Sequence, residues 1–182
     1  MSDRADALLV QDCLSGRSEA FGTLVDRYQV TMFNVSLRIV RDREDAADVT
    51  QTAFFKAFEN LKSFNPRYKF FSWLFRIVVN ESLNQLKRSR VYTELDEQLL
   101  SDEPGPDEKY HQEELQDRIE SALTDLKLEY RVVLVLRHFQ DLSYQDISYI
   151  TDVPEKTVKS RLFTARKLLR EKLMRRGVQL RG

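Results

Sequence analysis

Residues 142–173, LSYQDISYITDVPEKTVKSRLFTARKLLREKL, have the pattern of two helices joined by a tight turn. The first helix is expected to begin after Ser143, a good N-cap residue, and to end at residues 151–152. Asp152 suits a sharp turn because Asp tolerates a positive φ better than most residues do. Pro154 then fits the start of the second helix, where its missing N–H costs nothing. The stretch therefore predicts a helix-turn-helix.

The second helix of this stretch has an apolar face and a basic face. Its apolar residues recur at helical spacing and predict one buried stripe: Val158, Leu162, Ala165 and Leu169. The other side carries cations, a hydroxyl and an aromatic ring: Lys156, Lys159, Ser160, Phe163 and Lys167, flanked by Arg161 and Arg166. Such a face can enter the major groove of DNA. The alternative for this stretch alone is a solvated amphipathic hairpin without a DNA role.

The charges of the chain are balanced in total but unevenly distributed. Its 182 residues include 29 Lys and Arg and 29 Asp and Glu. Residues 154–182 hold ten basic and two acidic residues, whereas residues 91–114 hold one basic and nine acidic residues. This asymmetry indicates that different parts of the chain meet different partners.

Several functional classes are disfavoured by the composition. Cys13 is the only cysteine, which excludes a disulfide framework and a cysteine metal cluster and is typical of a reducing compartment. Residues 1–17 do not resemble a signal peptide, and the longest apolar run, 132–136, is too short to cross a membrane. We therefore expect a cytoplasmic protein without membrane insertion.

Enzymatic constellations are also missing from the sequence. His111 and His138 lie in different segments, and a chain with five glycines has no Gly-rich phosphate loop. Asp45 and Asp48 come closest to a carboxylate pair; a divalent cation site is one interpretation, but an exposed interaction surface is favoured. We expect no catalytic residue, no metal and no cofactor, so an enzyme with a nucleic-acid-binding tail is the weakest alternative.

Helical periodicity extends through most of the chain, and no stretch indicates a convincing strand. Four helices are expected in the first ninety residues, at about 3–15, from Ser18 onward, at 43–61 after an Asp42 cap, and at 72–88. Two inward-facing stripes are expected in them: Phe21, Leu24, Val25, Tyr28, Met32, Val35 and Ile39 in one, and Phe54, Ala57, Phe58 and Leu61 in the other.

The composition changes after this helical region. Residues 91–112 are acidic, contain Pro104-Gly105-Pro106 and are typical of a mobile linker. Helices at about 114–125 and 129–140 then precede the helix-turn-helix. The predicted fold class is all-α: two small helical domains, 1–90 and 114–182, joined by a flexible acidic linker, 91–113.

A second informative stretch, residues 62–87, interleaves aromatic and basic residues. Its aromatic side chains fall within twelve residues: Phe64, Tyr68, Phe70, Phe71, Trp73 and Phe75. Single-stranded DNA is bound by such combinations, because bases stack on rings at about 1–3 kcal/mol each while cations follow the phosphates. Core packing is favoured for Trp73, Leu74, Ile77 and Val78. A core role fits Phe64, Tyr68 and Phe70 less well, because they flank Pro66 in a polar loop.

Four motifs in a fixed order carry a resemblance to a known family: DAADVTQTAF (45–54), FSWLFRIVVN (71–80), YRVVLVLRH (130–138) and the helix-turn-helix (142–166). Over essentially its whole length the chain resembles the extracytoplasmic-function (group 4) sigma factors of bacterial RNA polymerase. The resemblance implies a subunit that binds core polymerase and directs promoter-specific initiation through −10 and −35 recognition. A dimeric helix-turn-helix regulator of duplex operators is the alternative.

The resemblance also implies roles for individual residues. Polymerase contacts, to the clamp helices of the largest subunit, are expected at Asp45, Asp48, Gln51, Phe54 and Lys56. Contacts to the unwound −10 strand are expected at Phe64, Asn65, Arg67, Tyr68, Lys69, Phe70, Trp73, Arg76, Asn80, Asn84, Lys87 and Arg88. Contacts to the −35 duplex are expected at Ser143, Tyr144, Lys156, Thr157, Lys159, Ser160, Arg161, Phe163, Thr164, Arg166 and Lys167.

Further partners follow from the same resemblance: the flap of the second-largest polymerase subunit, and an anti-sigma factor that masks both domains and can hold the protein at the membrane. The chain departs from the family pattern at several positions, since the family usually has Gly at Asp152, Ala at Ser148, Pro at Lys127 and often Trp at Phe58. Glu155 and Lys156 also replace residues that are commonly small or apolar. We therefore expect the −35 sequence preference to differ from that of relatives.

Overall fold

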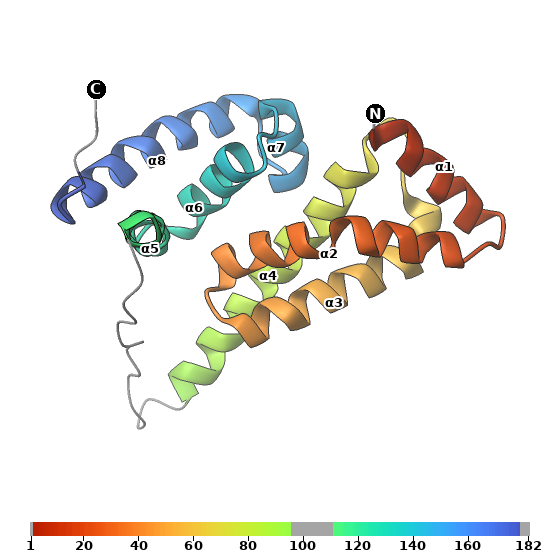
Figure 1. Ribbon diagram of the computed structural model, residues 1–182, viewed down its shortest axis with the longest axis horizontal. Coiled ribbons are helices and arrows are strands. Elements are labelled where there is room, and N and C mark those ends of the chain that lie inside the picture. The colour runs from red at the N-terminus through yellow and green to blue at the C-terminus, as the bar shows by residue number, and fades with distance from the viewer. Residues whose placement is uncertain (1, 96–110, 179–182) are drawn as a thin grey trace.

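The computed structural model describes residues 2–95 and 111–178, and within these ranges it contains helices and connecting turns but no strand (Figure 1). The helices form two units, one on either side of residues 96–110. The predicted all-α class and two-unit organisation are confirmed. No helix in the described ranges is both long enough and apolar enough to cross a bilayer.

The first unit consists of four α-helices and one 3₁₀ turn: α1 (Ser2–Leu14), α2 (Glu19–Val40), α3 (Arg43–Glu59), the turn Leu61–Ser63, and α4 (Phe70–Leu95). Helices α2, α3 and α4 pack against one another, and α1 packs on α2 (Figure 1). Large apolar side chains with almost no exposure fill the space between them: Leu24, Met32, Val35, Ile39, Leu74 and Phe75. Nearly all of the predicted α2 stripe therefore lies in the core.

The turn between α2 and α3 contains the predicted Asp42 cap and a left-handed residue that the sequence analysis does not predict. Arg41 adopts a left-handed conformation with φ of 74°, and its N–H is bonded to the carbonyl of Leu37. The side chain of Asp42 then accepts a hydrogen bond from the N–H of Asp45 at 2.8 Å, so the expected cap of α3 is confirmed. At the start of α2, Ser18 occupies the N-cap position but its side chain makes no capping hydrogen bond.

One predicted core residue of α3 lies at the surface. Phe58 is 46% exposed, whereas its neighbours Phe54, Ala57 and Leu61 are buried. Each residue of a helix is rotated by about 100° from the one before it, so Phe58 lies on the flank next to Ala57. Its ring contacts the edge of Phe21, with centroids 5.1 Å apart.

The second unit contains α5 (His111–Thr124), α6 (Leu128–Leu134), a π-helical turn (Val135–Phe139), α7 (Tyr144–Thr151) and α8 (Glu155–Arg175). The single helix expected at 129–140 is thus α6 followed by the π-helical turn. The turn that follows this segment contains Asp141, which has φ of 47°, and the N–H of Leu142 is bonded back to the carbonyl of Leu136 at 3.2 Å.

Both ends of the expected linker, 91–113, are helical. Helix α4 continues through Leu95, and α5 already begins at His111. The Pro104-Gly105-Pro106 segment and the rest of residues 96–110 lie outside the described residues.

The two units contact each other beside the C-terminal end of α2. The guanidinium of Arg38 lies 2.9 Å from a carboxylate oxygen of Glu120 in α5 and 4.1 Å from the centre of the Phe139 ring. Arg131 of α6, only 6% exposed, donates a hydrogen bond to the carbonyl of Ile39 at 2.9 Å. The sequence analysis does not predict this contact between the units.

Candidate nucleic-acid interfaces

The helix-turn-helix is formed by α7, the turn at residues 152–154, and α8. The hydroxyl of Ser143 accepts a hydrogen bond from the N–H of Asp146 at 3.0 Å, which confirms the predicted cap of α7. Asp152 has φ of 55° and ends α7 in the left-handed conformation, as expected for this turn. Pro154 lies at the N-cap of α8, one position before the first helical residue.

The buried stripe of α8 sets which of its faces points outward. Val158, Leu162 and Ala165 are almost fully buried, as predicted, and Leu169 is partly buried. Most of the residues expected to contact the −35 duplex are therefore exposed: Ser143, Lys156, Lys159, Ser160, Phe163, Arg166 and Lys167. Phe163 is 74% exposed, which is unusual for a phenylalanine in the middle of a helix. The remaining predicted residues are partly buried: Tyr144, Thr157, Arg161 and Thr164.

Two arginines of this predicted surface have protein partners. The guanidinium of Arg161 lies 2.9 Å from a carboxylate oxygen of Glu129 in α6. Arg166 donates its Nε hydrogen to Nε2 of His138 at 3.1 Å. Burial, together with the charges of Arg166 and Arg137, holds the pKa of His138 below its ordinary value. His138 is therefore neutral at pH 7 and free to accept this hydrogen bond.

The aromatic residues around the start of α4 are divided between the core and the surface. Phe64 packs against Phe70 and Trp73, with ring centroids 5.9 and 5.4 Å apart. Phe70, expected in the polar loop, is instead a core residue with 3% exposure, because α4 begins at Phe70 and directs its first turn inward. Trp73 is buried, as the core interpretation predicts, and Tyr68 is 45% exposed.

The polar members of the predicted −10 surface extend from the loop before α4 along one side of that helix. They are exposed: Asn65, Arg67, Lys69, Asn80, Asn84, Lys87 and Arg88. Within the loop, the Asn65 side chain accepts a hydrogen bond from the N–H of Arg67 at 3.0 Å, which fixes the turn around Pro66. Arg76 is partly buried and is directed towards α7.

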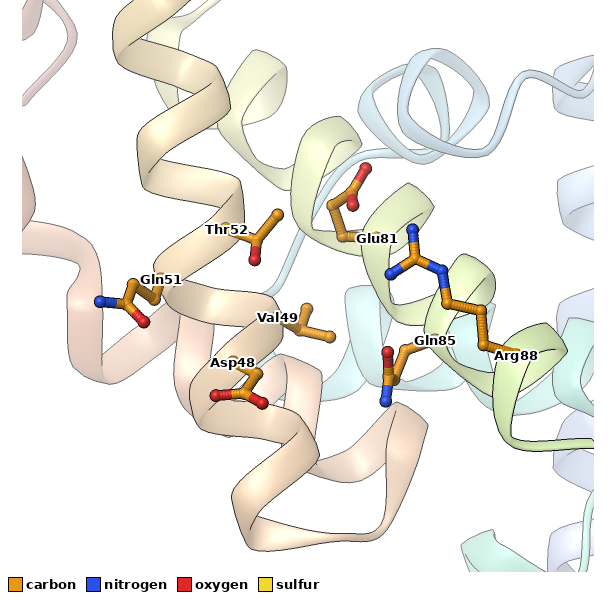
Figure 2. A pocket seen from close by; sticks show the side chains of 7 residues that line it. All are labelled: Asp48, Val49, Gln51, Thr52, Glu81, Gln85 and Arg88. Carbon is orange, nitrogen blue, oxygen red and sulfur yellow. The ribbon is translucent and has the colours of Figure 1, made fainter. Parts of the chain in front are cut away.

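The predicted polymerase-contact residues lie on α3, beside a polar pocket between α3 and α4 (Figure 2). The pocket has a volume of about 280 Å³ and is lined by side chains from both helices: Asp48, Val49, Gln51, Thr52, Glu81, Gln85 and Arg88. Asp48 and Gln51 are exposed, and Figure 2 shows Gln51 on the side of α3 that faces away from α4. A larger and more apolar groove of about 670 Å³ lies there, between α2 and α3.

The other three predicted polymerase contacts are less accessible. Asp45 accepts a hydrogen bond from Gln85 at 2.7 Å, and the ammonium of Lys56 lies 2.7 Å from Glu81. Phe54 is buried in the core, at the edge of the groove between α2 and α3. Of the five predicted polymerase contacts, only Asp48 and Gln51 are therefore classed as exposed on this face.

Within the described residues, no group of three or more His, Cys, Asp and Glu side chains is arranged to hold a metal ion.

The sequence analysis did not identify two residues that matter for the structure, Arg131 and Tyr149. Arg131 gave no signal because its hydrogen-bond acceptors are backbone carbonyls. Tyr149 contacts the first unit, and no local sequence pattern predicts such a contact.

Comparison with known proteins finds two family profiles in the chain: Sigma-70 region 2 at residues 24–91 and Sigma-70, region 4 at residues 116–169. The RNA polymerase sigma-H factor of Pseudomonas aeruginosa is 32% identical over 181 residues, covering 93% of this chain and 94% of that protein. The ECF RNA polymerase sigma-E factor of Escherichia coli K12 is 33% identical over 180 residues, covering 92% and 94% respectively.

Two solved structures have a similar fold at 26% sequence identity and a TM-score of 0.72. One is the sigma factor RpoE in complex with the anti-sigma factor NepR from Bartonella quintana, where the match covers 85% of this chain and 96% of that one. The other is CnrH in complex with the cytosolic domain of CnrY, where it covers 93% and 97%. The two matched profiles coincide with the first and second helical units.

Proposed function

Because the chain belongs to the extracytoplasmic-function sigma factors of bacterial RNA polymerase, we propose that its two units recognise two different forms of promoter DNA. The second unit, which contains α5 to α8, binds duplex −35 DNA through α8. The first unit, which contains α1 to α4, binds core polymerase and the unwound −10 strand. Binding of the protein to polymerase and DNA favours the opened promoter, and no covalent chemistry is required.

The observation that carries this assignment is the difference between the two exposed surfaces. The outer face of α8 combines cations with Ser160 and Phe163, whereas the loop before α4 presents Tyr68 among Asn65 and Arg67. A helix with this chemistry fits a major groove, where Lys contacts phosphates or guanine and an apolar ring contacts a thymine methyl. A ring among amides and cations fits unstacked bases instead.

The binding site for core polymerase is assigned to the exposed face of α3. Asp48 and Gln51 offer exposed polar groups there, and the apolar groove between α2 and α3 beside them can accept apolar side chains of a partner. The flap of the second-largest polymerase subunit is assigned to the second unit by analogy with the family. The protein acts in the cytoplasm in this proposal, since its template and core polymerase are there.

Control by an anti-sigma factor is part of the same proposal. The similar structure of RpoE contains the anti-sigma factor NepR, and its match covers both helical units of this chain. We expect such a partner to bind across both units and to compete with polymerase and promoter.

Reconstituted transcription tests the assignment directly. Core polymerase with this protein should give promoter-dependent run-off transcripts from templates recovered by sequencing the RNAs that appear when the protein is overproduced. Core polymerase alone is the control and should give none of them. An absence of protein-dependent transcripts on every recovered template would refute the proposed function.

A further inference from the structure

His138 and Arg166 bring two basic side chains together at the edge of the proposed −35-binding face. His138 belongs to the π-helical turn that precedes α7, and Arg166 belongs to α8. Both side chains are exposed, and the Nε hydrogen of Arg166 is donated to Nε2 of His138 at 3.1 Å. None of the −35 contacts predicted from the sequence lies in this turn, so His138 is an additional candidate for contact with DNA.

Arg166 lies at one edge of the outward face of α8, almost in line with Lys159. Seven residues separate the two, which is only about 20° short of two full helical turns. The ammonium of Lys159 lies 5.7 Å from the centre of the Tyr144 ring at the start of α7, and Arg166 contacts the turn before α7. The same edge of α8 therefore faces the segment that contains His138 and Tyr144.

This edge is better placed for phosphates than for bases. A helix in a major groove has a phosphate backbone on either side, so its central side chains face the base edges and those at its margin face phosphates. Arg166 also lies about three turns into α8, whereas recognition helices contact bases mainly through their N-terminal residues. A phosphate is therefore the DNA group expected beside His138 and Arg166.

The two side chains can donate to one phosphate together. Arg166 keeps two terminal nitrogens after its Nε–H is donated to His138, and neither has another partner in the part of the chain that the structure describes. Protonation of His138 converts Nε2 from an acceptor into a donor, so it releases the Arg166 N–H and can donate to a phosphate oxygen beside it. Hydrogen bonds from charged donors are stronger than those from neutral ones.

In the free protein, the surroundings of His138 favour its neutral form. Burial, followed by the charges of Arg166 and Arg137, lowers the pKa of His138. Arg137 is held in place by the carboxylate of Asp141 at 3.2 Å and the carbonyl of Leu142 at 2.8 Å. A phosphate beside His138 would offset the repulsion from the two arginines and so favour the imidazolium.

The helices around this turn do not supply an anion for His138. From α2, the guanidinium of Arg38 approaches, but it is paired with Glu120 at 2.9 Å. From α7, the ring of Tyr144 lies 5.6 Å from the guanidinium of Arg137. Among the described residues, no carboxylate is close enough to raise the pKa of His138. A DNA phosphate would thus be its first anionic partner.

We propose that His138 and Arg166 form a clamp for one phosphate group of duplex DNA, in which His138 takes part as the imidazolium. This inference rests on the function proposed above, because the clamp requires that α8 be applied to DNA. Formation of the clamp breaks the hydrogen bond between the two side chains and takes up one proton from solvent at His138. Since DNA then favours the protonated form, the affinity for DNA should increase as the pH falls through the range in which His138 titrates.

Three variants of the full chain test the clamp. His138→Gln keeps an acceptor for Arg166 but has no titratable group, and His138→Lys places a permanent cation at the same position. His111→Gln is the matched control, because His111 is the only other histidine of the chain. Fluorescence anisotropy with a labelled random-sequence duplex measures each affinity at about pH 5.5 and about pH 7.5 over a salt series.

Between the higher and the lower pH, the wild type and His111→Gln should gain about fivefold more affinity than His138→Gln. At the lower pH, the slope of log affinity against log salt should be about 0.9 steeper in the wild type than in His138→Gln, because one more phosphate is neutralised. At the higher pH, these two slopes should be nearly equal, and His138→Lys should already have the steeper one. Unfolding at low pH would weaken binding, so it cannot produce this gain.

Nuclear magnetic resonance gives a second readout. The imidazole C–H resonance of His138, assigned by comparison with His138→Gln, should titrate with a higher pKa when the duplex is present. An unchanged pKa, or equal pH dependence of binding in the wild type and His138→Gln, would overturn the clamp. So would a gain on a promoter duplex that is absent from the random duplex, because phosphates are present in every sequence.

A failure of the clamp is distinguishable from a failure of the proposed function. Protein-dependent transcripts together with a pH dependence that ignores His138 would remove the clamp alone. Without such transcripts the sigma-factor role is lost, while binding to the random duplex still reports whether His138 contacts a phosphate.

Discussion

The guanidinium of Arg131 donates a hydrogen bond to the carbonyl oxygen of Ile39 at 2.9 Å, and so joins the second unit to the C-terminal end of α2. Its other N–H groups donate to three backbone carbonyls at the junction of α5 and α6: Leu123, Thr124 and Leu126. Burial lowers the pKa of Arg131 to about 10, which still leaves it protonated at neutral pH. A single buried cation thus organises the second unit and its contact with the first.

Replacement of Arg131 by Met should lower the free energy of unfolding by about 3 kcal/mol or more, because four carbonyl oxygens lose this donor and three of these hydrogen bonds are buried. Arg131→Lys should recover little of the loss, since an ammonium cannot reach acceptors on two helices and an interhelical turn at once. Equilibrium urea denaturation measures both. A Met variant within about 1 kcal/mol of the wild type would show that these carbonyls find other donors.

Two capping positions give a matched pair for stability. Asp42 makes its side-chain cap, so Asp42→Ala should cost about 1 kcal/mol. Ser18 makes none, so Ser18→Ala should change the unfolding free energy by less than about 0.5 kcal/mol. Both values come from urea denaturation, and equal losses at the two sites would contradict the difference in geometry.

The helix-turn-helix shows which structural features can be predicted from the sequence. The helix-turn-helix could be predicted because its signals are local: a Ser cap, an Asp with positive φ, a Pro at the next helix start and one apolar stripe. The contact between Tyr68 and Tyr149 could not, since it joins residues far apart in the chain and depends on how two helical units dock. Periodicity describes each helix separately and carries no information on such docking.

The residues of the candidate DNA surfaces also divide into those whose position could be predicted from the sequence and those whose position could not. Exposure of Lys156, Ser160 and Phe163 follows from the stripe that α8 buries, and was predictable. Phe70 was misplaced because the start of α4 was expected two residues later, which put its ring in a loop. The sequence also placed Arg161 correctly beside the basic face, but it could not show that Glu129 from another helix reaches its guanidinium.

Lys159 and Arg161 should therefore differ in their contributions to duplex binding. Lys159 is exposed, so Lys159→Ala should lower the slope of log affinity against log salt by about 0.9 if one phosphate contact is lost. Arg161→Ala should lower it less, because the charge of Arg161 is already paired with Glu129. Anisotropy titrations on a random-sequence duplex over a salt series measure both slopes. An equal decrease for the two variants would mean that the Arg161–Glu129 pair opens on DNA.

Phe163 should affect DNA binding without affecting folding. Phe163→Ala removes a ring that is mostly in water, so the unfolding free energy should change by less than about 0.5 kcal/mol. The affinity for a promoter duplex, chosen upstream of the transcripts that depend on the protein, should fall about fivefold. This corresponds to a loss of roughly 1 kcal/mol of binding free energy when an apolar contact in the groove is removed. Met174→Ala is the control, as another exposed apolar residue of α8 beyond the predicted surface. Similar effects of the two variants on binding would remove Phe163 from the interface.

His138 should make the stability of the second unit depend on pH. Its folded-state pKa lies below the ordinary value, mainly through burial and then through the charges of Arg166 and Arg137. As the pH falls through about 6.5, the unfolded chain takes up a proton that the folded protein resists, so the free energy of unfolding decreases. In His138→Gln, which retains an acceptor for Arg166, the decrease between about pH 7.5 and about pH 5.5 should be smaller than in the wild type. Urea denaturation across this range tests the difference, with His111 present in both proteins as an internal constant. Identical pH profiles would show that folding does not lower the pKa of His138.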